Sequence, residues 1–294
     1  MNACCERQCT GAIGPEAAFS TLSRAMFGAS YPEGAHKLRH NLGPHPLLEL
    51  EALAWLCELL PAGSVEQHRG DLAIGGGRDP APGGLKPGEA IRSIRDTDSR
   101  LVLNDIERVP AYAALLRDLL GELEPEIVDR TGAMLSTRSC IVVSSPGAVT
   151  PYDFDPAHTI LLQLAGKTAV SVLTAGHTLV ASDPVRERRQ TGDGREPTWR
   201  DEIDAGRVTF RLEPGEATYV PVMAPRYLRN GPEPSVSLSI AWRSEWSLAE
   251  ADARAFNNLV RRWGFSPLPP RRWPARNRAK SIAWRALRRL PGID

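Results

Sequence analysis

The sequence lacks any run of apolar residues long enough to cross a membrane. Its first residues, from Met1 to Arg7, also lack the basic segment followed by an apolar one that marks a secretory signal. Cysteine is scarce, with only five residues. An odd number of cysteines without an export signal predicts reduced thiols in a cytoplasmic protein. Cys4, Cys5 and Cys9 lie close together near the start, where their spacing favours a frayed segment over a metal or redox motif.

Aromatic residues are also few, at 6%, whereas glycine and proline each number 25. Hydrophobic residues make up 42% of the chain and charged residues 24%, a balance that excludes wholesale disorder. The 294 residues suffice for one large domain or two modest ones, with a core that needs no disulfides. The many glycines and prolines favour a turn-rich β architecture over a helical bundle.

Charge is distributed unevenly, although the net charge of the whole chain is only +1. Residues 253–294 contain eleven lysines and arginines and a single acidic residue, so the rest of the chain is acidic. A basic segment of this kind can attract phosphate or anionic lipid. Its many apolar residues, among them Trp263, Trp273 and Trp284, favour instead packing on the acidic body or on a second subunit.

Hydrophobic periodicity divides the chain into four parts. Residues 1–30 are expected to be a flexible segment, and residues 31–135 a helical region with helices over 47–60 and 109–123. Residues 136–247 contain six short β-rich runs separated by turns, which predict a sandwich or barrel. The six runs are 139–145, 159–164, 169–173, 208–212, 217–222 and 235–242. Residues 183–200 are expected to form a polar loop, and residues 248–294 a helical basic tail.

Three short motifs carry most of the chemical information. They are Thr150–Thr159 (TPYDFDPAHT), Leu212–Pro221 (LEPGEATYVP) and Pro225–Asn230 (PRYLRN). Together they resemble the JmjC/cupin-like (cupin_8-type) family of Fe(II)- and 2-oxoglutarate-dependent oxygenases. The resemblance covers about residues 30–265. It is strongest to bacterial cupin-like proteins akin to the asparaginyl hydroxylase that acts on hypoxia-inducible factor. It implies an α+β chain whose β core is a double-stranded β-helix, with helices before and after it.

The resemblance also shows where this chain departs from the family. The family holds iron with a His-x-Asp pair and a distal histidine, and Asp155 matches the carboxylate of that pattern. The two histidine positions are occupied by Asp153 and Arg226. Asp153 could still supply an oxygen ligand, but a guanidinium stays protonated and has no lone pair to donate. We therefore expect Arg226 to form a buried ion pair with Asp155, Asp153 or both.

The cosubstrate positions implied by the resemblance are altered as well. Thr150 matches a family hydroxyl, and Thr159 lies where asparagine is common. Thr168 aligns with the family lysine, whereas Lys167 is displaced by one residue and should point to the other face of its strand. His158 could join Asp153 and Asp155 as a third metal ligand, but the family often carries a structural histidine there.

Three functions remain open from the sequence. The first is a non-canonical or inactive relative of the oxygenases that binds a peptide, protein or small acid in the barrel cleft. The second is an active protein or peptide hydroxylase that uses Fe(II) and 2-oxoglutarate with an altered metal centre. The third is a nucleic-acid-associated module that acts through the basic tail. A homodimer formed through the C-terminal helices is expected in each case.

Overall fold

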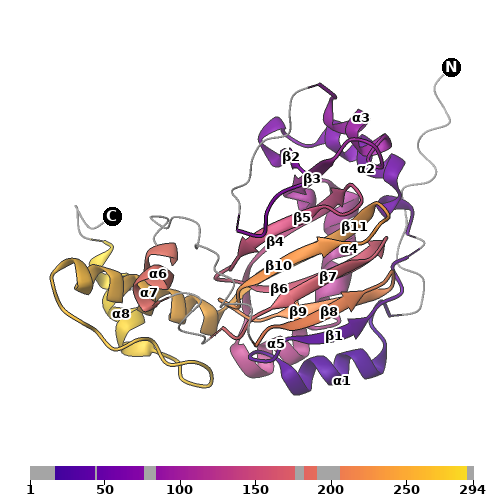
Figure 1. Cartoon of the computed structure of the whole chain (residues 1–294). Coiled ribbons are helices and arrows are strands. Elements are labelled where there is room, and N and C mark those ends of the chain that lie inside the picture. Colours follow the sequence, from indigo (N-terminus) through magenta and orange to yellow (C-terminus); the bar gives the residue numbers. More distant parts are fainter. Residues whose placement is uncertain (1–16, 44, 76–83, 176–181, 191–205, 290–294) are drawn as a thin grey trace.

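The computed structural model describes residues 17–43, 45–75, 84–175, 182–190 and 206–289, in which two antiparallel sheets form the centre (Figure 1). The larger sheet has seven strands in the order β1-β9-β6-β11-β4-β3-β2. Its strands are β1 (His36–Arg39), β9 (Glu216–Val220), β6 (His158–Ala165), β11 (Ser235–Ser244), β4 (Met134–Ser144), β3 (Ser99–Asn104) and β2 (Val65–Arg69). The smaller sheet consists of β5 (Val149–Asp153), β10 (Arg226–Asn230), β7 (Thr168–Val172) and β8 (Val208–Leu212), in that order.

Five of the helices cover the face of the large sheet that points away from the small one. These are α1 (Thr21–Ser30), α2 (Leu50–Leu59), α3 (Pro87–Arg92), α4 (Pro110–Gly121) and α5 (Glu124–Thr131). Their buried side chains, such as Phe27 and Leu53, form one continuous core with strand residues such as Leu101 and Ile141. This burial of apolar surface is the main force that holds the helices to the sheet. No helix in the described part of the chain is long and apolar enough to span a membrane.

Three further helices lie together to one side of the sheets (Figure 1). They are α6 (Asp183–Gln190), α7 (Glu245–Arg262) and α8 (Arg278–Leu287). Helix α7 continues directly from β11, and Ser244 caps its first turn by accepting a hydrogen bond from the Ser247 N–H. The chain therefore has the mixed α+β architecture predicted from the sequence, with a double-stranded β-helix core.

Alternation along the strands decides what each face of the large sheet contacts. In β11, Val236, Leu238, Ile240 and Trp242 are buried in the core beneath the helices. The intervening positions, Ser235, Ser237, Ser239 and Ala241, face the space between the two sheets. Successive side chains of a strand point to opposite faces, so the period-two pattern predicted both the strand and its polar face. That polar face turns toward an internal cavity.

The structure corrects the prediction for the first 135 residues. Helix α1 occupies residues 21–30, where Phe27 is fully buried, so this part of the expected flexible segment belongs to the fold. The region expected to be helical also contributes β1, β2 and β3 to the large sheet. Strands β1 (HKLR) and β2 (VEQHR) lie at the two edges of the sheet and are rich in polar residues, which hides the apolar pattern of a strand. In the segment expected to be a polar loop, residues 183–190 form α6, and residues 191–200 lie outside the described part.

Two glycines with left-handed backbone give a matched test of the turns in the barrel. Gly166 (φ +67°) lies between β6 and β7, where an added Cβ would collide with the carbonyl oxygen of Pro234. Gly147 (φ +69°) has the same conformation, but an added Cβ would meet no atom within 4 Å. Gly147→Ala is expected to lower the free energy of unfolding by about 1–2 kcal/mol through backbone strain. Gly166→Ala should lower it by at least about 1 kcal/mol more. Equal decreases in urea unfolding would contradict the close contact at Gly166.

Candidate functional site

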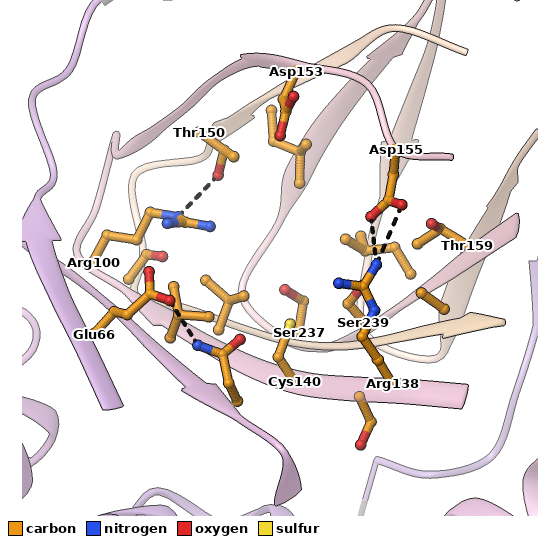
Figure 2. A pocket seen from close by; sticks show the side chains of 18 of the residues that line it. Glu66, Arg100, Arg138, Cys140, Thr150, Asp153, Asp155, Thr159, Ser237 and Ser239 are labelled. Carbon is orange, nitrogen blue, oxygen red and sulfur yellow. Dashed lines mark hydrogen bonds and ion pairs between the residues drawn. The ribbon is translucent and has the colours of Figure 1, made fainter. Parts of the chain in front are cut away.

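A polar cavity of about 500 Å³ lies between the two sheets. Its walls come from β2, β3, β4, β6 and β11 of the large sheet and from β5 and β10 of the small one. Serine and threonine hydroxyls, several carboxylates and three guanidiniums line it, and Figure 2 shows two of those guanidiniums, Arg100 and Arg138. The cavity contains five of the residues singled out from the sequence, namely Thr150, Asp153, Asp155, Thr159 and Arg226.

The three arginines are held in different ways. Arg100 on β3 donates from Nε to the hydroxyl oxygen of Thr150, at 3.1 Å. Arg138 on β4 contacts both carboxylate oxygens of Asp155 from Nη2, at 3.4 Å. Arg226 on β10 is half-buried, and its Nη1 atom is buried without a hydrogen-bond partner among the described residues. The cavity thus contains one guanidinium nitrogen that the described part of the fold leaves unpaired.

Strand pairing places Arg226 beside the family metal position. Strands β10 and β5 are antiparallel, with Arg226 opposite Asp153. The ladder shifts between Arg226 and Leu228, a bulge that changes the direction of the side chains on either side of it. The expected ion pair of Arg226 with Asp155, Asp153 or both is wrong for the described residues, because Arg226 pairs with neither carboxylate and Arg138 from β4 contacts Asp155 instead. Asp155 also accepts a hydrogen bond from the N–H of Ala157, at 3.0 Å.

These residues do not fit the iron that the resemblance implies. Arg226 cannot ligate a metal, and Arg138 competes for the carboxylate of Asp155. Within the described residues, no group of three histidine, cysteine, aspartate or glutamate side chains is arranged to hold a metal ion. Asp153 and Asp155 would supply two oxygen ligands at most from the predicted set, which is fewer than a facial triad needs.

His158 lies on the opposite face of β6 from the cavity and is fully buried. Its Nδ1 is 2.8 Å from the hydroxyl oxygen of Tyr219, and its Nε2 is 3.2 Å from that of Ser244. The Tyr219 hydroxyl donates to the carbonyl of Pro32, so Nδ1 must be the donor to Tyr219 and Nε2 the acceptor from Ser244. Burial lowers the pKa of His158 to about 3. This is a neutral structural histidine, and it is not placed to join Asp153 and Asp155.

The predicted cosubstrate residues are divided between the cavity and its surroundings. Thr150 and Thr159 line the cavity, and the hydroxyl of Thr159 is buried without a hydrogen-bond partner among the described residues. Lys167 and Thr168 do not line it. Lys167 forms an exposed ion pair with Glu213 at 2.6 Å, and Thr168 donates to the side-chain oxygen of Asn230.

Several cavity residues were missed from the sequence. Glu66 on β2 accepts hydrogen bonds from Asn104, at 2.9 Å, and from His68, also at 2.9 Å. Arg100 lies on β3 next to the buried Leu101, and Arg138 lies on β4 two residues before Cys140, which stands between the buried Ser139 and Ile141. That alternation could have shown that the two arginines share a face with Asn104 and Cys140. It could not have shown that the face is internal.

The pKa of the Cys140 thiol depends on burial and on the charged side chains near it in the cavity wall. Burial raises the pKa of its thiol, and the nearby guanidiniums of Arg100 and Arg226 partly oppose that rise. The thiol therefore stays protonated at neutral pH. Arg100 from the large sheet and Arg226 from the small sheet therefore both lie near this thiol, as does the carboxylate of Glu66.

Comparison with known proteins supports the fold assignment. No family model and no curated protein sequence matches the chain. The X-ray structure of YcfD from Escherichia coli superposes with a TM-score of 0.54 and 18% identity, over 94% of this chain and 70% of YcfD. A second structure, of the E. coli ribosomal oxygenase YcfD, gives a TM-score of 0.48, 18% identity and coverages of 94% and 69%. The structure of YcfD in complex with cobalt and 2-oxoglutarate superposes with a TM-score of 0.49 and 17% identity, over 94% of this chain and 69% of YcfD.

The fold is therefore that of the JmjC/cupin-type oxygenases. One solved protein with this fold is YcfD, with which the chain superposes over 94% of its own length and 70% of the length of YcfD. An identity of 18% carries the fold and not the chemistry of the site.

Proposed function

We propose that this protein binds a small carboxylic acid in the barrel cavity and does so without iron. The observation that carries the proposal is the buried Nη1 of Arg226, which has no hydrogen-bond partner among the described residues and lies at the position of a family metal ligand. A buried donor without a partner costs about 1–3 kcal/mol, and a carboxylate ligand would remove that cost. Guanidinium also matches a carboxylate with two parallel hydrogen bonds.

The surroundings of Arg226 suit such a ligand. Thr159 offers a second buried hydroxyl without a partner in the described residues. The β11 serines, Ser235, Ser237 and Ser239, supply further hydrogen-bonding groups. A volume of about 500 Å³ is typical of a pocket for a small molecule, which favours an acid over a folded protein partner. The permanent positive charge of Arg226 would then take the place of the metal cation that the family uses.

Arg226→Gln is expected to weaken acid binding by about 10-fold to 100-fold, because the variant lacks one charge-assisted hydrogen bond to the ligand. Binding of acetate, succinate and 2-oxoglutarate would be measured by calorimetry without added metal. Lys167→Gln is the matched control, because it removes an exposed cation that lies outside the cavity lining. If the two variants bound these acids equally well, the role of Arg226 would be refuted.

The rival function is Fe(II)- and 2-oxoglutarate-dependent hydroxylation with an altered metal centre. The fold shared with YcfD supports it. Anaerobic reconstitution with Fe(II) distinguishes the two functions. Near-stoichiometric iron that disappears in Asp155→Ala, together with succinate formation from 2-oxoglutarate, would replace our proposal with this one.

A further inference from the structure

Nine of the eleven cations of the basic tail fall into two groups in the structure, and the other two are Arg262 and Lys280. Members of the first group pair with acidic residues of the chain and hold the C-terminal helices in place. These pairs are Arg254 with Glu250 (2.6 Å), Arg261 with Glu187 (2.6 Å), Arg272 with Glu33 (3.0 Å) and Arg285 with Asp252 (2.6 Å). Glu187, Glu250 and Arg254 are almost fully buried, so this group has a structural role.

The second group consists of five exposed arginines, Arg271, Arg276, Arg278, Arg288 and Arg289. None of their guanidiniums forms an ion pair or hydrogen bond with another described residue. Five like charges within one short segment repel one another, and no partner in the described body offsets that repulsion. These arginines therefore have no role in the fold that the structure reveals, and we call them together the basic face.

A groove runs beside the basic face between α5, α7 and α8. It has a volume of about 640 Å³ and is lined by Arg276 and Arg278 of the basic face, and by Arg130 and Arg285. Trp273 forms part of its wall and is fixed there by a hydrogen bond from its indole N–H to the carbonyl of Arg130. Asp129 and Glu245 also line the groove, which leaves arginine in excess.

Exposed aromatic rings lie in the same C-terminal region. Trp263 is 57% exposed and Phe265 is 66% exposed, just after the end of α7. Lys280 donates to the carbonyl of Leu268 at 2.5 Å, which holds this turn against the start of α8. The C-terminal region thus contains both exposed guanidiniums and two largely exposed aromatic rings, which lie outside the lining of the groove.

We propose that the basic face and its groove bind single-stranded nucleic acid. Arginine forks match phosphate oxygens, and exposed rings offer stacking surfaces to unpaired bases. A concave groove suits a strand better than a lipid surface. Helix α8 is also poorly suited to a membrane, because Ile282 is the one large apolar side chain that is strongly exposed along it. This site is separate from the cavity between the sheets, so the proposals of nucleic-acid binding and of acid binding can be tested independently.

The test measures binding of a fluorescent oligouridylate of about 12 nucleotides by anisotropy, between about 50 and about 200 mM salt. The wild type should bind with a steep salt dependence. Changing the five arginines of the basic face to glutamine should weaken binding at least about 10-fold at the lowest salt. The slope of log affinity against log salt should become shallower by about 0.7 for each phosphate that the variant no longer neutralises.

A double variant, Arg117→Gln with Arg229→Gln, is the control for loss of charge elsewhere on the surface. Both arginines are exposed on the body and form no side-chain ion pair or hydrogen bond with another described residue. Equal weakening per charge removed in the control and in the basic-face variant would refute the site, because charge alone would then explain it. Binding of phosphatidylserine vesicles in place of the oligonucleotide would overturn the assignment. The assignment would also be overturned if the wild type sedimented as a dimer and the basic-face variant as a monomer, since the surface would then join two copies of the chain.

Discussion

Replacing Asp153 and Arg226 with histidine is expected to convert the cavity between the two sheets into an iron site. With Asp155, the two histidines would complete the two-histidine, one-carboxylate set of the fold family. The register of β10 against β5 already places positions 226 and 153 opposite each other. Fe(II) affinity, measured as bound metal after anaerobic dialysis, should rise by on the order of 100-fold or more over the wild type.

Arg138 makes this experiment more informative. Its guanidinium contacts Asp155, so a further Arg138→Gln change should free the carboxylate and increase iron binding again. Adding Asp155→Ala to the triple variant should abolish iron binding. Failure of both the double and the triple variants to hold iron, with the fold intact by circular dichroism, would show that positions 153, 155 and 226 do not converge as the register indicates.

The protein is expected to become steeply less stable as the pH falls below about 6.5, the ordinary pKa of histidine. Burial lowers the pKa of His158 to about 3 and that of His40 to about 4. Both remain neutral in the folded state while the unfolded chain takes up protons, so falling pH favours unfolding. Each histidine should lower the free energy of unfolding by about 1.4 kcal/mol per pH unit, until the pH approaches its folded pKa.

Urea unfolding at several pH values between about 7 and about 5 measures this decrease. His158→Gln should reduce the slope of stability against pH, because glutamine can hydrogen-bond with Tyr219 and Ser244 but does not titrate in this range. His40→Gln should also reduce this slope, independently of His158→Gln. Comparing slopes cancels the contribution of other groups, such as Glu33, whose pKa burial raises. A slope that His158→Gln leaves unchanged would contradict the buried neutral state.

Sequence patterns predicted six strands, β4, β6, β7, β8, β9 and β11, and missed the edge strands β1, β2 and β5 together with the inner strands β3 and β10. The run SVSLSIAW predicted β11 because its alternation is strict and one of its faces is fully apolar. Strands β1 and β5 lack such a pattern and exist because a partner strand supplies their hydrogen bonds. Sequence neighbours cannot reveal that partner.

The same distinction explains which site residues were found. Asp153, Asp155 and Thr150 lie within one short motif, and Arg226 within another, so local sequence was enough to identify them. Arg100 and Arg138 reach the cavity only because β3 and β4 pair side by side in the large sheet. The ion pair between Arg138 and Asp155 depends on that pairing and on the approach of the small sheet. No spacing in the sequence encodes it.

The edge position of β1 has a consequence for how the chain is made. Strand β1 pairs with β9, and the contact between His36 and Thr218 joins residues 182 positions apart. The bond between Glu33 and Arg272 spans 239 positions. At ribosomal rates of about 5–20 residues per second, β9 is synthesised roughly ten seconds or longer after β1. The nascent chain thus carries an unpaired strand through most of its synthesis, and such an exposed strand edge can pair with another chain and aggregate.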